Sequence, residues 1–163
     1  MKYFKNPDFS YLFRSKPMAV AEMRGSINHP NIQGLVWFYR TEFGVIVVSD
    51  IMGLPTSTNA CNSPIFAFHI HGGNECSGNA SDPFANAGMH YNPNNCPHPY
   101  HAGDLPPLFG ANGNAFSAVL TDRFTIDEII GKTVIIHSNP DDFTTQPSGN
   151  SGSKIACGVI RKF

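Results

Sequence analysis

The sequence predicts an all-β domain in which short antiparallel strands form a sandwich or flattened barrel. A chain of 163 residues fits a single domain. Hydrophobic residues make up 41% of the chain and include 13 Phe, which is enough to fill one core. The 15 Gly and 13 Pro interrupt the chain too often for long helices, so short strands joined by structured loops are expected.

The predicted strands are short, rich in Val, Ile and Phe, and bounded by Gly, Pro, Asn or Ser. They cover residues 18–24, 32–39, 44–51, 64–71, 115–120, 132–137 and 155–160. One helical turn is expected at residues 125–130, because Thr125 and Glu128 have the spacing of a capping box ahead of two isoleucines. A set of seven or eight such strands is typical of an antiparallel sandwich or barrel.

Residues 72–114, between the fourth and fifth predicted strands, form a long irregular segment. Gly, Asn, Pro and Ser dominate it, and no periodicity of apolar residues survives. Loops of ~40 residues are uncommon in compact domains unless they are functional or disordered. This segment contains His90, His98, His101 and Asp104, whose side chains can fix a loop by binding a metal, so we expect it to be functional.

Residues 1–17 are predicted to be an N-terminal extension, poorly ordered, ahead of one domain at residues 18–163. The extension lacks the continuous apolar region of a signal peptide, so an export signal is either absent or trimmed from this chain. The longest apolar stretches are far shorter than the ~20 residues that span a bilayer. No transmembrane helix and no membrane partner are therefore expected.

The charge balance argues against a nucleic-acid partner. The chain has 11 Lys+Arg and 12 Asp+Glu, a net charge of -1, and only 14% of its residues are charged. A groove for nucleic acid or a patch for anionic lipid would have to be built from very few cations. Neither partner is expected.

The four cysteines are even in number and contain no C-x-x-C pair, which argues against a zinc ribbon or a thioredoxin-type site. They are Cys61, Cys76, Cys96 and Cys157. Paired disulfides are the simplest interpretation, and buried free thiols are the alternative. Disulfides would favour an oxidising, extracytoplasmic compartment.

All but one of the 7 histidines lie at or after position 69, and this clustering indicates a metal site. His69 and His71 alternate with Phe68 and Ile70, so the two imidazoles point to the same face of a strand. Two neutral imidazoles on one face make half of a transition-metal site, although surface histidines on a strand are also common. The three histidines and the aspartate of the long loop are the right number and type for a closed tetrahedral zinc site.

Five motifs in order along the chain resemble the copper/zinc superoxide dismutases. They are F-H-I-H at 68–71, G-M-H-Y-N-P at 88–93, H-A-G-D-L-P at 101–106, V-I-I-H at 134–137 and G-N-S-G-S-K-I-A-C-G-V-I at 149–160. The short spacing from His71 to Cys76 and the G-D-L-P-P-L at 103–108 are similar to the bacterial branch of that family. The resemblance covers residues 18–160 and implies a Greek-key β-sandwich of about eight strands.

The resemblance implies an enzyme that dismutates superoxide to O₂ and H₂O₂, with copper cycling between Cu(II) and Cu(I) beside a structural zinc. Carried over residue by residue, it assigns copper to His69, His71, His90 and His137, and zinc to His90, His98, His101 and Asp104. His90 would bridge both metals and carry a proton during turnover. The remaining histidine, His29, is expected to be a surface residue.

The resemblance also implies roles beyond the ligands. Asp141 matches an aspartate that accepts hydrogen bonds from one copper ligand and one zinc ligand, although Asn139-Pro140-Asp141-Asp142 alone would indicate a turn. Lys154 stands where the family has an arginine that attracts and orients the superoxide anion, so looser orientation is expected, unless this is a surface lysine without a role.

Cys76 and Cys157 match the intrasubunit disulfide of the family. Cys61 and Cys96 have no counterpart in the common pattern, and a second bridge between them or two free thiols are both open.

Two other functions remain open from the sequence. One is a dismutase-like domain that buffers copper and zinc with little turnover, which the altered Lys154 would favour. The other is a structural β-domain with a zinc site only. The chain is expected to be a monomer or a homodimer.

Overall fold

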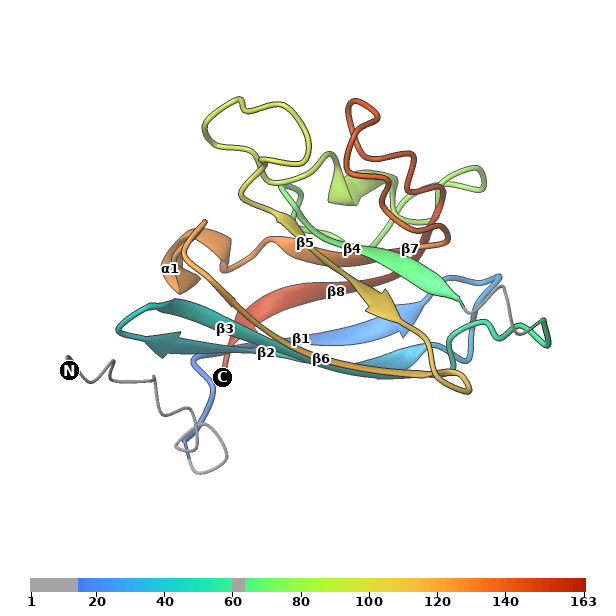
Figure 1. Ribbon diagram of the computed structural model, residues 1–163, viewed down its shortest axis with the longest axis horizontal. Helices are drawn as coiled ribbons and strands as arrows, with labels where there is room; N and C mark the ends of the chain where they lie inside the picture. Colours follow the sequence, from blue (N-terminus) through green and yellow to red (C-terminus); the bar gives the residue numbers. More distant parts are fainter. Residues whose placement is uncertain (1–14, 60–63) are drawn as a thin grey trace, which may run out of the picture.

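The computed structural model describes residues 15–59 and 64–163 and confirms the all-β prediction (Figure 1). Eight strands form one sheet: β1 (Ala19–Gly25), β2 (Gln33–Thr41), β3 (Gly44–Met52), β4 (Ile65–His71), β5 (Asp104–Phe109), β6 (Asn114–Thr121), β7 (Thr133–His137) and β8 (Lys154–Lys162). A short 3-10 helix, η2 (Ala85–Ala87), and one turn of α-helix, α1 (Ile126–Ile129), interrupt the connections. Most of the expected N-terminal extension lies outside the described residues, so the domain boundary stays a prediction.

The sheet is a nearly closed antiparallel sandwich. Its strand order is β5-β4-β7-β8-β1-β2-β3-β6. The two outer strands, β5 and β6, approach each other and bring the ends of the sheet together. Chain neighbours such as β3 and β4 are separated in this order, whereas β3 pairs with β6 and β4 with β7, as in a Greek key.

The core lies between the two halves of this folded sheet. On β1 the alternating residues Ala19, Ala21 and Met23 are fully buried, as the period of two requires. Ala21 lies opposite Val36 of β2, which is also fully buried. The register of the strands therefore directs one continuous set of apolar side chains inward.

The strands β4 and β7 are buried on both faces. All of β7 is buried, and so is β4 after its first residue, although β4 alternates apolar and histidine side chains at its end. Two loops, residues 72–103 and 138–153, lie over the end of the sandwich where these strands meet (Figure 1). The same loops cover the histidines of β4 and β7, which are placed at the strand ends.

The prediction that residues 72–114 form one irregular loop is wrong at its C-terminal end, where Asp104–Phe109 form β5. This strand was not predicted because it contains Pro106 and Pro107. Proline cannot donate a hydrogen bond to a neighbouring strand, so prolines favour a loop in a prediction. β5 is an edge strand and pairs only with β4, so its proline nitrogens need no partner.

The predicted helical turn is confirmed as α1. The carboxylate of Glu128 accepts hydrogen bonds from the backbone N–H of Thr125 at 2.6 Å and from its hydroxyl at 2.7 Å. These contacts satisfy groups at the helix start that have no partner within the helix.

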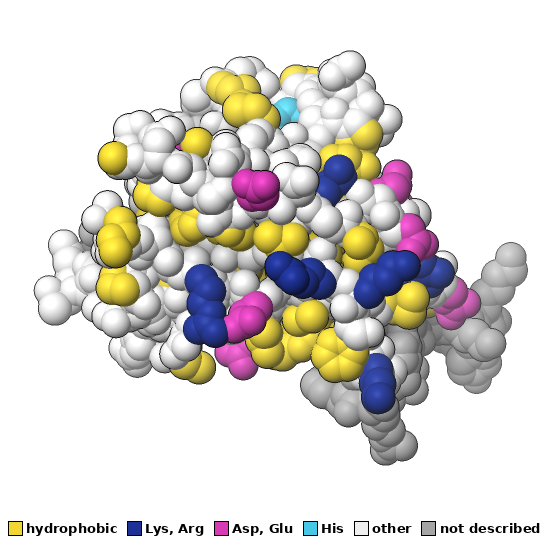
Figure 2. All heavy atoms as spheres, turned by 180° about the vertical axis from the view of Figure 1, so that it is seen from behind, with side chains coloured by type: hydrophobic (Ala, Val, Ile, Leu, Met, Phe, Trp, Pro, Cys, Tyr) yellow, Lys and Arg dark blue, Asp and Glu magenta, His cyan; other side chains and the backbone are white. Residues whose placement is uncertain are grey.

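No helix within residues 15–59 and 64–163 has the length and apolar character needed to cross a bilayer. On the face shown in Figure 2, lysine and arginine side chains are separated by apolar side chains and by aspartate and glutamate.

Candidate metal centre

The histidine-rich site lies where β4, β5 and β7 meet the loop of residues 72–103. Two groups of side chains are each arranged so that their possible ligand atoms lie within 4.8 Å of one another. The first group is His69, His71, His90 and His137, and the second is His90, His98, His101 and Asp104. All of these residues are buried, and only a small area of histidine surface is visible in Figure 2.

The sheet register positions several of the seven side chains. His69 of β4 lies opposite Asp104, the first residue of β5. A member of the first group and a member of the second group are therefore placed side by side on neighbouring strands. The segment around His90 continues this pairing, because His90 forms an isolated antiparallel bridge with His71. Hydrogen bonds of 2.8 Å run from Gly72 N to Met89 O and from Tyr91 N to Ile70 O. His90 is therefore held by backbone pairing although it lies in a loop.

In the first group the imidazoles converge closely. Nε2 of His71 lies 3.2 Å from Nε2 of His137, and the rings of His69 and His90 are 4.0 Å apart between centroids. Burial, reinforced by the neighbouring imidazoles, lowers the pKa of His71 well below its usual value. Burial and the charge of His69 lower the pKa of His137 to about 3. Both rings are therefore neutral at pH 7, which is the form that binds a metal cation.

In the second group the Nδ1 atoms gather around the carboxylate of Asp104. Nδ1 of His90 lies 2.7 Å from Oδ1 of Asp104, and Nδ1 of His101 lies 3.3 Å from Oδ2. Nδ1 of His98 approaches Oδ2 to 3.1 Å without the alignment of a hydrogen bond. Burial acts to raise the pKa of Asp104, but the imidazoles, led by His90, outweigh it and lower the pKa, so the group stays an anion.

His90 belongs to both groups and presents a different nitrogen to each. Its Nδ1 faces Asp104, whereas its Nε2 is buried without a hydrogen-bond partner. One imidazole thus offers a donor atom to each of two adjoining sites.

Several of the remaining ring nitrogens are held by acceptors outside the two groups. Asp141 accepts from Nε2 of His69 at 2.7 Å and from Nε2 of His98 at 2.9 Å, so it joins one member of each group. Nδ1 of His71 donates to the carbonyl of Gly88 at 2.8 Å. These contacts fix each ring and leave its other nitrogen without a proton, facing the group.

Asp141 is confined by its surroundings. A Cβ added to Gly149 would lie 2.0 Å from Oδ1 of Asp141, and the φ of Gly149 is +67°, so glycine is needed on both counts. Burial acts to raise the pKa of Asp141, but hydrogen bonds from His69, the Phe143 N–H and His98 outweigh it and lower the pKa strongly.

The donor set fits two metal ions. Among the described residues, the buried side-chain atoms without a hydrogen-bond partner include Nδ1 of His69, Nε2 of His90 and Nδ1 of His98. A buried polar atom without a partner costs free energy, and three such nitrogens directed into two clusters are explained by cations bound there. The first group is all nitrogen and the second contains a carboxylate, the combinations that suit copper and zinc, respectively.

A hollow opens beside the first group. It is lined by His71, Ser81, Asp82, Pro83, Gly88, Met89, His90, His137, Ser148, Ser151, Gly152, Ser153 and Lys154. Lys154 begins β8 and lies opposite His137 of β7 in the sheet, so the register places its side chain beside this group. Its ammonium forms an ion pair with Asp82, which the sequence analysis did not identify as a partner.

The expected disulfide between Cys76 and Cys157 is present and joins the loop of residues 72–103 to β8. For the other two cysteines the sequence left a second bridge or two free thiols open, and the free-thiol alternative holds at Cys96. Its segment is held differently: the Asn92 side chain accepts from Cys96 N at 3.0 Å and donates to Cys96 O at 2.8 Å. Cys61 lies outside the described residues.

His29 belongs to neither group and contacts Ser26.

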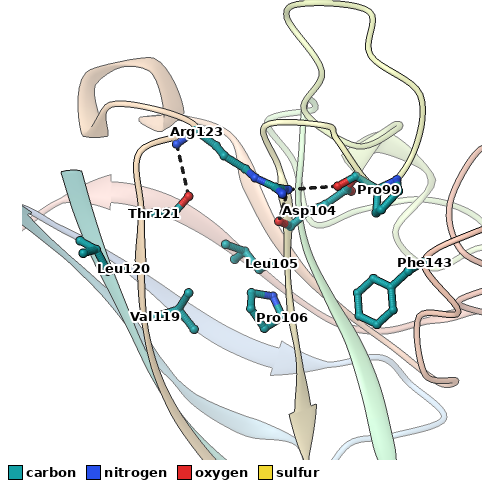
Figure 3. A pocket seen from close by; sticks show the side chains of 9 residues that line it. All are labelled: Pro99, Asp104, Leu105, Pro106, Val119, Leu120, Thr121, Arg123 and Phe143. Atoms are coloured by element: carbon teal, nitrogen blue, oxygen red, sulfur yellow. Dashed lines mark hydrogen bonds between the residues drawn. The ribbon is translucent and has the colours of Figure 1, made fainter. Parts of the chain in front are cut away.

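Sequence reasoning also missed Arg123, which follows β6. One nitrogen of its guanidinium donates to the carbonyls of Pro99 at 3.1 Å, Asp104 at 3.2 Å and His101 at 3.4 Å. Figure 3 shows the side chain reaching across a shallow pocket toward Pro99 and Asp104. Nothing in the sequence signals this contact, because the partners are backbone carbonyls 19 to 24 residues away in the chain.

Comparisons with known proteins agree with this geometry. The family model for copper/zinc superoxide dismutase matches residues 32–160. Superoxide dismutase [Cu-Zn] 2 of Aquifex aeolicus is 35% identical over 136 residues, which are 74% of this chain and 74% of the relative. Superoxide dismutase [Cu-Zn] of Legionella pneumophila is 33% identical over 136 residues, with 78% and 77% covered.

The solved structure of Cu/Zn superoxide dismutase from Brucella abortus superposes with a TM-score of 0.72 at 25% identity. The superposition covers 86% of this chain and 98% of that one.

Proposed function

The chain belongs to the copper/zinc superoxide dismutase family, and on that premise we propose that its two histidine groups catalyse the dismutation of superoxide with copper and zinc as cofactors. One observation carries the proposal: two buried groups of possible ligands share His90, and both contain ring nitrogens that no protein atom satisfies. A structural role alone would not require unpaired nitrogens at the centre of two adjoining clusters.

We assign copper to His69, His71, His90 and His137, and zinc to His90, His98, His101 and Asp104. Bound copper supplies one-electron chemistry, in which one superoxide is oxidised to O₂ and a second, with two protons, is reduced to H₂O₂, while zinc has no redox role. His137 serves the first group only and His98 the second only, so substitutions can separate the two functions.

His90 has the position for proton transfer. Its Nδ1 faces Asp104, and its Nε2 faces the first group, next to the hollow that Lys154 lines. A proton taken up at Nε2 would lie at the site where superoxide is reduced, while Nδ1 remains held on the side of the second group. This shared imidazole therefore couples proton delivery to the site of electron transfer.

Lys154 supports capture of the substrate anion. It is the only lysine or arginine among the described residues that line the hollow beside the first group. A single ammonium attracts an anion, but it lacks the planar set of donors by which an arginine would orient it.

Asp141 and the loops keep the site rigid. By accepting from His69 and His98, Asp141 fixes the tautomer and orientation of one ring in each group. The disulfide and the backbone pairing of His90 hold the covering loop, and the hollow opens beside the first group.

The disulfide between Cys76 and Cys157 favours an extracytoplasmic location, where such bonds persist.

One observation favours a second function, a domain that binds copper and zinc with little turnover: the cation expected to attract the substrate is engaged by Asp82. Loading the protein with both metals, measuring metal content and then assaying superoxide consumption distinguishes the two. We expect one copper and one zinc per chain and rapid dismutation. Full metal content without turnover would favour the second function.

A further inference from the structure

The ion pair between Lys154 and Asp82 sits at the mouth of the first histidine group. Nζ of Lys154 lies 2.5 Å from Oδ2 of Asp82, and the side chains are 16% and 37% exposed. Both residues line the same hollow as His71, His90 and His137. The ammonium that faces an entering anion is thus already bound to a carboxylate of the chain.

Asp82 is held in a defined turn. Its Oδ1 accepts from the Phe84 N–H at 3.0 Å, and its own N–H donates to the side chain of Asn79 at 3.0 Å. The carbonyl of Asp82 also packs tightly on Gly78, where an added Cβ would lie 2.1 Å away. These contacts hold the carboxylate of Asp82 at the hollow, beside Lys154.

The loop that carries Asp82 and the strand that carries Lys154 are also joined covalently. Cys76, ahead of the turn, is bonded to Cys157, which follows Lys154 on β8. The disulfide thus keeps the acidic turn against the strand that bears the ammonium.

The pair cancels the charge of the entrance. Apart from histidines, Asp82 and Lys154 are the charged residues among the described residues that line the hollow. A carboxylate bound to that ammonium weakens its attraction for other anions.

We propose that Asp82 is a specificity-determining residue, a built-in competitor that occupies Lys154 and lowers the affinity of the entrance for small anions. Before it reaches the first group, an anion must displace the carboxylate of Asp82 from the ammonium. If the carboxylate stays in place, the anion is attracted more weakly, because the ammonium charge is partly neutralised. This inference rests on the proposed function, since it takes the hollow to be the substrate entrance.

The test measures azide binding to the copper- and zinc-loaded protein from the absorption of the copper–azide complex. Asp82→Asn keeps an oxygen for the Phe84 N–H and removes the charge, and it should tighten azide binding about three- to tenfold. In a Lys154→Gln background the same change should give a smaller gain, because the ammonium it would release is gone. Asp127→Asn is the matched control, since it breaks an exposed ion pair with Arg40 away from the hollow, and it should leave azide affinity unchanged.

Unchanged azide affinity in Asp82→Asn would overturn the proposal. Weaker binding would also overturn it, because it would mean that Asp82 orients the ammonium for the anion and does not compete with it.

A second measurement separates this inference from the proposed function. If the wild type loaded with copper and zinc does not dismutate superoxide, the proposed function fails, and the ion pair is judged on the metal-free protein. There the rate of Lys154 acylation by acetic anhydride, followed by peptide mass spectrometry, should be higher in Asp82→Asn than in the wild type, because the side-chain nitrogen is no longer held in an ion pair that the reagent must displace. Equal rates would show that Asp82 does not occupy Lys154.

Discussion

Nε2 of His69 donates to Oδ2 of Asp141 over 2.7 Å in the interior of the protein, which fixes the direction in which the other ring nitrogen points. The other oxygen of Asp141 accepts a hydrogen bond from Nε2 of His98, so one carboxylate sets the orientation of a ring in each histidine group. The ring orientations of His69 and His98 thus depend on Asp141, a residue that belongs to neither group.

Replacing Asp141 by Asn should therefore weaken binding of both metals by about ten- to a hundredfold, because the amide cannot accept both imidazole N–H groups as an anion does. Competition with chelators would measure the affinities. Asp142→Asn is a matched control, since that neighbouring carboxylate is exposed and bonds only within its own turn, to Thr144 and Thr145. Equal metal affinities for wild type and Asp141→Asn would refute the orienting role.

Arg123 should act on the second group alone. Replacing it by Ala removes the donor shared by the carbonyls of Pro99, His101 and Asp104, so the loop that carries three of the proposed zinc ligands becomes looser. We expect zinc affinity to fall by about tenfold, the equivalent of one or two lost hydrogen bonds. Arg40→Ala, which removes an exposed arginine on β2, is the comparison and should bind zinc normally. A normal zinc affinity in Arg123→Ala would contradict the prediction.

The aspartate of the second group should be needed for zinc but not for copper. In Asp104→Ala the three imidazoles lose the carboxylate around which their Nδ1 atoms gather. We expect zinc to be lost first, and dismutation to fall as a consequence because His90 is no longer held on that side. Metal analysis after dialysis checks this, and a normal zinc content would count against the assignment.

The metal-free protein should lose stability as the pH falls from about 6.5 toward 3. Histidines of the unfolded chain titrate near 6.5, whereas burial lowers the pKa of His69, His71 and His137 in the folded state, that of His137 to about 3. The unfolded state therefore binds more protons in this window, and each such group costs about 1.4 kcal/mol of stability per pH unit.

Urea unfolding in the presence of a chelator, at several pH values, measures this slope. His71→Gln removes one of the buried imidazoles, so the unfolded state binds about one proton fewer. The slope should therefore fall by about 1.4 kcal/mol per pH unit. A stability that is independent of pH between 6.5 and 4 would contradict the account.

Much of the fold could be predicted because it depends on local patterns. Short stretches rich in Val, Ile and Phe between turn residues, which predict β1, β2 and β3, and the capping box at Thr125 are visible in the sequence and are confirmed. The strand β5 was missed because Pro106 and Pro107 are typical of loops, and only its place at the edge of the sheet makes them acceptable.

The candidate ligands were predictable from residue type and order, but their supports were not. Arg123 binds backbone carbonyls, and Asp82 meets a lysine 72 positions away, so neither contact leaves a pattern in the sequence. The free thiol of Cys96 shows the limit of counting cysteines: an even number permits pairing without requiring it.

The central claim is that the two groups are separate metal sites that meet at His90, with catalysis at the first. His137→Ala tests it most directly, because His137 belongs to the first group only. After loading with copper and zinc, this variant should keep about one zinc per chain and lose dismutation by at least about a hundredfold, in line with the loss of a metal ligand. Full dismutation activity in His137→Ala, measured at normal zinc content, would contradict the account.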